Sequence, residues 1–116
     1  LIWLNDINPM PSKTKIVRSA KGKLFEDGSR EMIIDFSRIA VNQLNSISMN
    51  ASSNHGKIIA TELIANPSID GARVFLRFQP EDADVAELRL QLMNKDTPIS
   101  ETWLYRWIKP SLFAGE

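Results

Sequence analysis

Aromatic side chains recur at every second position near the C-terminal end of the chain. In residues 99–107, Trp103, Tyr105 and Trp107 occupy alternate positions. This period of two predicts a strand with all three rings on one sheet face. Such a face either closes the core of a domain or offers flat apolar surfaces on which a sugar ring can stack. Core use is the more common role, so we expect Trp103 and Tyr105 to face the core and Trp107, near the strand's end, to reach a neighbour.

Carboxylates and a single histidine are the other candidates for chemistry. Cleavage of a glycosidic bond needs a pair of carboxylic acids, and Asp35 and Glu101 lie within predicted strands. A carboxylate in a strand is more often paired with an arginine, and the candidate partners are Arg73, Arg77, Arg89 and Arg106. His55 lies in a turn-like run, Ser-Ser-Asn-His-Gly, so we interpret it as an exposed turn residue. We therefore assign no catalytic residue to this chain.

Composition excludes several classes of site and partner. The chain has no cysteine and one histidine, which leaves no thiolate or multi-histidine zinc site, and we expect neither a metal nor a cofactor. The 14 basic residues balance the 14 acidic ones, so no charge excess points to nucleic acid or an anionic membrane surface. No apolar run approaches the ~20 residues of a membrane-spanning helix. We expect no nucleic-acid partner and no membrane span.

Short strands separated by turn residues dominate the pattern. Alternating apolar residues predict strands at 15–20, 30–36, 47–51, 57–64, 72–78, 85–92 and 99–107. Residues 37–45 are ambiguous and fit either a single helical turn or an irregular connection. About seven short strands without an amphipathic helix predict an all-β fold, an immunoglobulin-like antiparallel β-sandwich. The 116 residues are enough for one such domain and too few for two.

Flanking segments complete the expected organisation. We expect a linker from a missing N-terminal domain, the β-sandwich, and a C-terminal tail at residues 1–13, 14–109 and 110–116. Because the chain begins at Leu1 without a signal-peptide pattern, we expect it to be a piece of a longer protein. Apolar residues at the ends of a domain often mark an interface. The candidates for contact with a carbohydrate or another domain are Trp3, Trp103, Tyr105, Trp107 and Phe113.

Three segments, taken in order, resemble a known family. They are residues 31–36 (Glu-Met-Ile-Ile-Asp-Phe), residues 66–78 (Asn-Pro-Ser-Ile-Asp-Gly-Ala-Arg-Val-Phe-Leu-Arg-Phe) and residues 98–107 (Pro-Ile-Ser-Glu-Thr-Trp-Leu-Tyr-Arg-Trp). Together they resemble the C-terminal domain of the periplasmic glucan biosynthesis proteins, types G and D, over about residues 15–108. The Gly-rich segment that often follows Asp-Phe in the family is replaced here by Ser-Arg-Ile-Ala at residues 37–40. The loop at that point can therefore differ in shape.

The resemblance implies a location and a biological context. The family acts in the Gram-negative periplasm on osmoregulated periplasmic glucans, whose backbone is β-1,2-linked glucose. Its large N-terminal domain holds the glucan cleft and the acids implicated in glucan processing. Its smaller C-terminal domain is immunoglobulin-like and packs on the first. No position here matches the cleft-bearing domain, so no family catalytic residue is carried over, and type G is not distinguished from type D.

Our preferred hypothesis is an accessory, non-catalytic domain of a periplasmic protein required for osmoregulated periplasmic β-glucan biosynthesis. Its expected partner is its own N-terminal glucan-binding domain, which a rigid sandwich would hold in position. One alternative is an autonomous carbohydrate-binding module that binds β-glucan on the aromatic strand face. Another is an enzyme in its own right, whereas we expect the processing of β-1,2-glucan to belong to the missing N-terminal domain.

Overall fold

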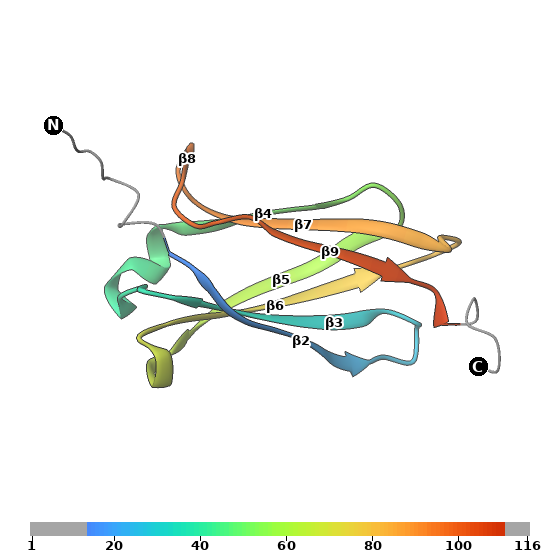
Figure 1. The fold of residues 1–116 in the computed structure, drawn as a ribbon, viewed down its shortest axis with the longest axis horizontal. Coiled ribbons are helices and arrows are strands. Elements are labelled where there is room, and N and C mark those ends of the chain that lie inside the picture. The colour runs from blue at the N-terminus through green and yellow to red at the C-terminus, as the bar shows by residue number, and fades with distance from the viewer. Residues whose placement is uncertain (1–13, 111–116) are drawn as a thin grey trace, which may run out of the picture.

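Two antiparallel β-sheets face each other and form a sandwich (Figure 1). The computed structural model describes residues 14–110. The first sheet has the order β2-β3-β6-β5, with strands at Ile16–Leu24, Arg30–Ser37, Gly71–Gln79 and Lys57–Asn66, respectively. In the second sheet β7 pairs with β4, β8 and β9, and these four strands span Val85–Asn94, Ile47–Ser53, Thr97–Pro98 and Trp103–Ile108. This arrangement confirms the expected all-β antiparallel sandwich.

The core is built from every second residue of the central strands. Because side chains alternate across a strand, one face of each strand turns inward. The inward residues that are at most 1% exposed are Met32, Ile34 and Phe36 in β3, Ala72, Val74, Leu76 and Phe78 in β6, and Ala86, Leu88, Leu90 and Leu92 in β7. Burial of one such side chain stabilises the fold by about 1.5–3 kcal/mol. These inward faces agree with the alternation read from the sequence.

The last strand begins later than the sequence predicts. The predicted start of this strand at residue 99 is wrong, because β9 begins at Trp103. The preceding residues pair with Thr14 instead, in a parallel bridge between Thr14 and Ser100. The Thr14 N–H donates to the Ile99 carbonyl at 2.9 Å, and the buried Ser100 Oγ accepts the Leu92 N–H at 2.9 Å. These bonds divert the chain before it resumes as β9.

Two short 3-10 helices connect the strands. The ambiguous segment before β4 contains the 3-10 helix η2 (Val41–Ser46), and η3 (Pro67–Ile69) lies between β5 and β6. Asp70, directly after η3, has a left-handed φ of 51°. A Cβ at Gly71 would overlap the carbonyl oxygen of Phe36 on β3, so only glycine fits this position. The Asn-Pro and Asp-Gly dipeptides thus form a tight turn against the neighbouring strand.

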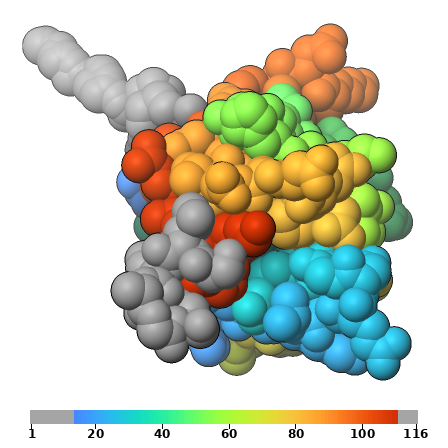
Figure 2. All heavy atoms as spheres, turned by 90° about the vertical axis from the view of Figure 1, so that its right-hand side faces the viewer, coloured from blue at the N-terminus to red at the C-terminus, as the bar shows by residue number. Residues whose placement is uncertain are grey.

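The two ends of the sandwich carry different connections. The 3-10 helices η2 and η3 lie at one end (left in Figure 1), and the β2–β3, β4–β5 and β6–β7 connections lie at the other. Thr14 lies at the first end, beside Gln43 and Ser46 of η2. Figure 2 views this second end, where the β2–β3 connection, in blue and cyan, lies beside the yellow and orange chain around the β6–β7 connection. Within residues 14–110 no helix is both long and apolar enough to cross a membrane.

Candidate functional site

The aromatic ladder of β9 faces the core. Trp103 is 4% exposed, and its ring stacks in parallel on Tyr105 with 5.7 Å between the centroids. Tyr105 is half-buried and packs against the core. Trp107 meets Phe78 of the opposite sheet edge-on, with 5.5 Å between the centroids. The three rings therefore help to close the sandwich, and they do not form an open stacking surface in this structure.

The position of Trp107 differs from what we expected, which was contact with a neighbouring domain. Its side chain is 8% exposed. The period of two keeps it on the same face as Trp103, and its partner in the ladder, Ala86, is small enough to leave room for the indole. Contact with another domain through Trp107 would need this ring to leave the core. The other two contact candidates, Trp3 and Phe113, lie outside the described residues.

The outer face of the first sheet carries an aromatic residue among charged ones. Arg73, Phe75 and Arg77 alternate with the core residues of β6 and so face outward. Antiparallel pairing sets Ile33 of β3 on one side of Phe75 and Glu62 of β5 on the other. Phe75 is half-buried by these neighbours. The face is therefore mixed, with apolar surface at its centre and charges around it.

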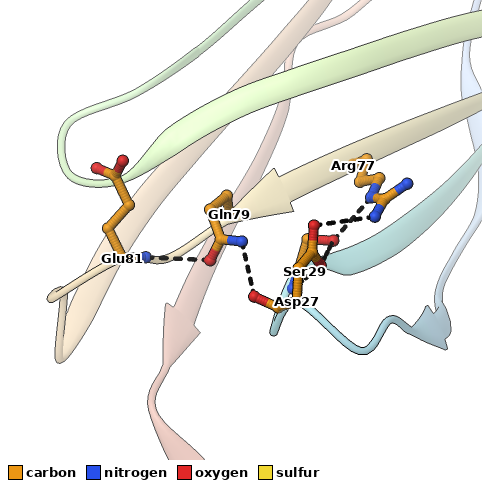
Figure 3. A network of polar contacts seen from close by, with 5 residues as sticks. All are labelled: Asp27, Ser29, Arg77, Gln79 and Glu81. Atoms are coloured by element: carbon orange, nitrogen blue, oxygen red, sulfur yellow. Dashed lines mark hydrogen bonds and ion pairs between the residues drawn. The ribbon is translucent and has the colours of Figure 1, made fainter.

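Arg77 is held by the turn between β2 and β3 (Figure 3). Its Nε donates to Ser29 Oγ at 2.7 Å, and its Nη2 donates to Asp27 Oδ2 at 3.1 Å. The guanidinium carbon also lies 3.7 Å from the centre of the Phe25 ring, a cation–π contact. Gln79 Nε2 donates to the carbonyl oxygen of Asp27 at 2.9 Å, which ties the turn to β6 a second time. Arg77 and Phe25 are thus fixed relative to each other.

The same turn keeps Asp27 ionised. The hydroxyl group of Ser29 donates a hydrogen bond to Asp27 Oδ1 at 2.6 Å, and the backbone N–H of Ser29 donates one to the same oxygen at 2.9 Å. These two hydrogen bonds, together with the charge of Arg77, lower the pKa of Asp27 from its ordinary value of 3.8. Asp27 therefore carries a fixed negative charge that positions Arg77.

A hollow of about 410 Å³ lies beside these residues on the outer face of the first sheet. Its lining includes Phe25, Glu31, Ala60, Glu62, Phe75 and Arg77. Ala60 is paired with Arg77 in the β5–β6 ladder, next to a bulge in β5 between Ile58 and Ala60. Because the methyl side chain fills little of the space beside Arg77, the sheet surface is hollowed at this point.

Asp35 is paired with an arginine, as expected for a strand carboxylate. Arg73 donates from Nε and Nη2 to the two carboxylate oxygens at 2.8 and 3.1 Å, and Asn66 Nδ2 donates to Oδ1 at 3.3 Å. The hydrogen bonding by Arg73 lowers the pKa of Asp35 from 3.8, although burial acts in the opposite direction. A carboxylic acid that donates a proton in catalysis needs a raised pKa. Asp35 therefore anchors β3 to β6 and to the end of β5.

The remaining sequence candidates lie apart from one another. Glu101 is exposed, and its Oε2 accepts the Ile16 N–H at 2.9 Å. His55 is exposed in the turn between β4 and β5, as expected. Among residues 14–110, no three or more His, Cys, Asp or Glu side chains are grouped so that they could hold a metal ion. The acids considered from the sequence are thus structural partners of the backbone or of an arginine.

A second hollow, also about 410 Å³, lies at the opposite end of the sandwich. It opens between η2 and the η3 turn, and its lining includes Ile39, Ala40, Val41, Pro67 and Gly71. The Ile39 N–H donates to the Asp70 carbonyl at 3.0 Å, which joins the two connections. Val41 is 69% exposed. Apolar surface gathered at one end of a domain is a common mark of contact with another surface.

Sequence reasoning did not single out Phe25 or Phe75, and it considered Arg77 only as a possible partner of a strand carboxylate. A signal for Phe75 was present, because the alternation in β6 turns this aromatic side chain away from the core. No local signal existed for Phe25, whose position depends on a turn and on Arg77 in a distant strand.

Comparisons with known proteins identify a family model and relatives that match this chain. Residues 1–107 match a family model described as "Periplasmic glucan biosynthesis protein, MdoG". The glucans biosynthesis protein G 2 of Shewanella oneidensis is 42% identical over 103 residues, which cover 89% of this chain and 19% of that protein. The glucans biosynthesis protein G of Vibrio cholerae is 30% identical over 110 residues, covering 92% of this chain and 20% of that protein. The glucans biosynthesis protein D of Pseudomonas syringae is 27% identical over 89 residues, which cover 72% of this chain and 16% of that protein.

The chain spans about a fifth of the length of the first two relatives, 19% and 20%. The family match extends over residues 1–107, and so includes β2 to β8 in full and β9 up to Trp107. The chain therefore belongs to the periplasmic glucan biosynthesis protein family.

Proposed function

We propose that this chain is the C-terminal accessory domain of a periplasmic protein required for osmoregulated periplasmic glucan biosynthesis. In this proposal it is not the catalytic part, and it acts by packing on the part that binds and processes glucan. The observation that carries the proposal is a family match over residues 1–107 by a chain that spans about a fifth of its relatives. The described residues have a hydrophobic core of their own, as a separately folding domain requires.

The state of the acids supports a structural role. Asp27 and Asp35 both have a lowered pKa, and each accepts hydrogen bonds from an arginine. An acid that protonates the leaving group in glycoside cleavage works with a raised pKa. These two carboxylates are therefore suited to fixing turns and strands, and we assign glucan processing to the remainder of the protein.

The surface that we assign to the domain contact is the end that carries η2 and η3. It has the apolar hollow beside Val41 and Pro67. Thr14 lies at the same end, beside Gln43 and Ser46 of η2, so the linker expected at residues 1–13 would join the sandwich there. Thr14 Oγ1 is also buried without a hydrogen-bond partner among the described residues, and a neighbouring polar group could satisfy it. The occupant of this surface is the preceding domain of the same protein.

The alternative of a carbohydrate-binding module on the aromatic strand has less support. Trp103 and Trp107 are 4% and 8% exposed. A sugar that stacked on their faces would first have to displace Tyr105 or Phe78 from them.

A matched pair of variants tests the proposal, made both in this chain alone, for binding to the remainder of the protein, and in the full-length protein, for glucan yield. Val41→Glu puts a charge on the proposed contact, and Leu104→Glu puts the same charge on β9, away from it. The two side chains are similarly exposed, Val41 at 69% and Leu104 at 71%. Because burying an unpaired charge is costly, we expect Val41→Glu to weaken binding between this chain and the separately produced remainder by about tenfold or more. Periplasmic glucan yield should fall with it, and Leu104→Glu should match the wild type.

Deletion of the domain supplies the decisive outcome. We expect a protein without this chain to give a reduced glucan yield that a co-expressed chain restores. Normal yield after the deletion, or equal effects of the two glutamate variants, would overturn the assignment.

A further inference from the structure

We infer that the hollow on the outer face of the first sheet is a saccharide-binding site. The choice of a glucan as its ligand rests on the proposed function, but the site itself is assigned from its own chemistry. It is separate from the aromatic ladder of β9 and from the end assigned to the domain contact.

The aromatic walls are the first reason. Phe75 lies at the centre of the outer face, and Phe25 reaches the same hollow from the β2–β3 connection. Flat apolar rings of this kind can pack against the apolar faces of a pyranose ring. The hollow of about 410 Å³ falls within the range of about 300–1,000 Å³ that small ligands occupy. Ala60, paired with Arg77 in the ladder, is small and leaves space beside that side chain.

The polar groups around the rings are the second reason. Glu31 and Glu62 offer carboxylate oxygens, which accept hydrogen bonds from hydroxyl groups strongly. Arg77 offers donors, and Ser29 and Asp27 fix its position before any ligand arrives (Figure 3). The Phe25 ring packs against its guanidinium as well. Such preorganisation reduces the ordering cost of binding. The lining therefore presents fixed donors and acceptors beside apolar rings.

The balance of charge favours a neutral ligand. Two carboxylates and one guanidinium line the hollow, so a phosphate or another anion would meet more repulsion than attraction. A polyhydroxy ligand can use both signs without a charge of its own. The site also lies beside β5, one of the two edge strands of the sheet, so a chain of sugar units longer than the hollow can continue past this edge.

Titration of the 116-residue chain with a linear β-1,2-linked glucose oligosaccharide tests the site. Amide chemical shifts measured by NMR should change saturably at residues 60–62 and 75–77. Phe75→Ala should weaken the affinity by about tenfold, since it removes one stacking surface. Glu62→Gln should weaken it by about fivefold, since it replaces a charged acceptor on an exposed position. Leu104→Ala, on the other sheet, is the matched control and should bind as the wild type does.

The spectra also report whether each variant is folded, and Glu62→Gln keeps the test open if Phe75→Ala unfolds. The absence of saturable changes up to about 10 mM oligosaccharide, tenfold above a millimolar dissociation constant, would overturn the proposal. Changes centred on residues 103–107 would overturn it in favour of the aromatic strand. A failure here is distinct from failure of the accessory role, because domain deletion and Val41→Glu test that role without any need for the hollow.

Discussion

The indole N–H of Trp103 donates to Ser19 Oγ at 2.8 Å and so joins β9 of one sheet to β2 of the other. The parallel bridge between Thr14 and Ser100 joins the same pair of chain segments at the end of the sandwich. Both contacts lie along the side where β2 and β9 are the edge strands. The tryptophan thus contributes its ring to the core and its polar atom to the seam between the sheets.

Replacement of Trp103 by phenylalanine removes the seam bond and part of the buried ring. We expect the free energy of unfolding to fall by about 1–3 kcal/mol, because a hydrogen bond is lost and a cavity is left. Urea unfolding followed by circular dichroism measures this change. Leu104→Ala, next along the strand and 71% exposed, should change it by about 0.5 kcal/mol or less. Equal losses in the two variants would show that Trp103 does not close the sandwich.

Local alternation explains what the sequence could predict. The inward faces of β3, β6 and β7 follow from a period of two that each strand carries by itself, as with Val74 and Leu76 against Phe75. The pairing of Asp35 with an arginine was also foreseeable, since a buried carboxylate needs a partner. Which arginine it would be depended on the register of β3 against β6, which sets Asp35 opposite Arg73.

The features that were missed depend on contacts far apart in the chain. The late start of β9 results from the pairing of Thr14 with Ser100 and from the bond between Ser100 Oγ and the Leu92 N–H. The hollow beside Phe75 depends on a turn that carries Phe25 over Arg77. No short window along the sequence contains both Thr14 and Ser100, or both Phe25 and Arg77, so periodicity could not predict these features.

Gly71 should be intolerant of any side chain. Gly71→Ala would drive its Cβ into the Phe36 carbonyl oxygen, and we expect a loss of about 3 kcal/mol or more in the free energy of unfolding, as for other severe steric conflicts in a packed sheet. Gly22→Ala is the control, because its Cβ would meet only the flexible end of Glu31. Thermal unfolding of both variants compares them. A Gly71→Ala protein as stable as Gly22→Ala would contradict the close approach of β6 to β3.

The ion pair of Asp35 should make stability depend on pH in the acid range. In the folded protein the pKa of Asp35 lies below its ordinary value of 3.8. The stability that Asp35 contributes is therefore fully present at a pH above its pKa in the unfolded chain, and it is lost as the pH falls through its pKa in the folded protein. Asp35→Asn lacks this titration. We expect the wild type to be more stable than Asp35→Asn above about pH 4, with the difference shrinking toward pH 2. Urea unfolding at a series of pH values measures it, and a difference that stays constant would exclude a lowered pKa for Asp35.

The turn that holds Arg77 can be tested through the titration of its carboxylate. Ser29→Ala removes the side-chain hydrogen bond that contributes most to the low pKa of Asp27, so this pKa should rise toward 3.8. Carbon-detected NMR of the carboxyl group across the acid range measures the pKa directly. Ser68→Ala is the control, since Ser68 bonds Asn66 in the η3 turn and should leave Asp27 unchanged. Because Ser29 Oγ also accepts from Arg77 Nε, the same variant should loosen the guanidinium and weaken oligosaccharide binding in the hollow. An unchanged pKa of Asp27 in Ser29→Ala would mean that the turn does not depend on this hydroxyl.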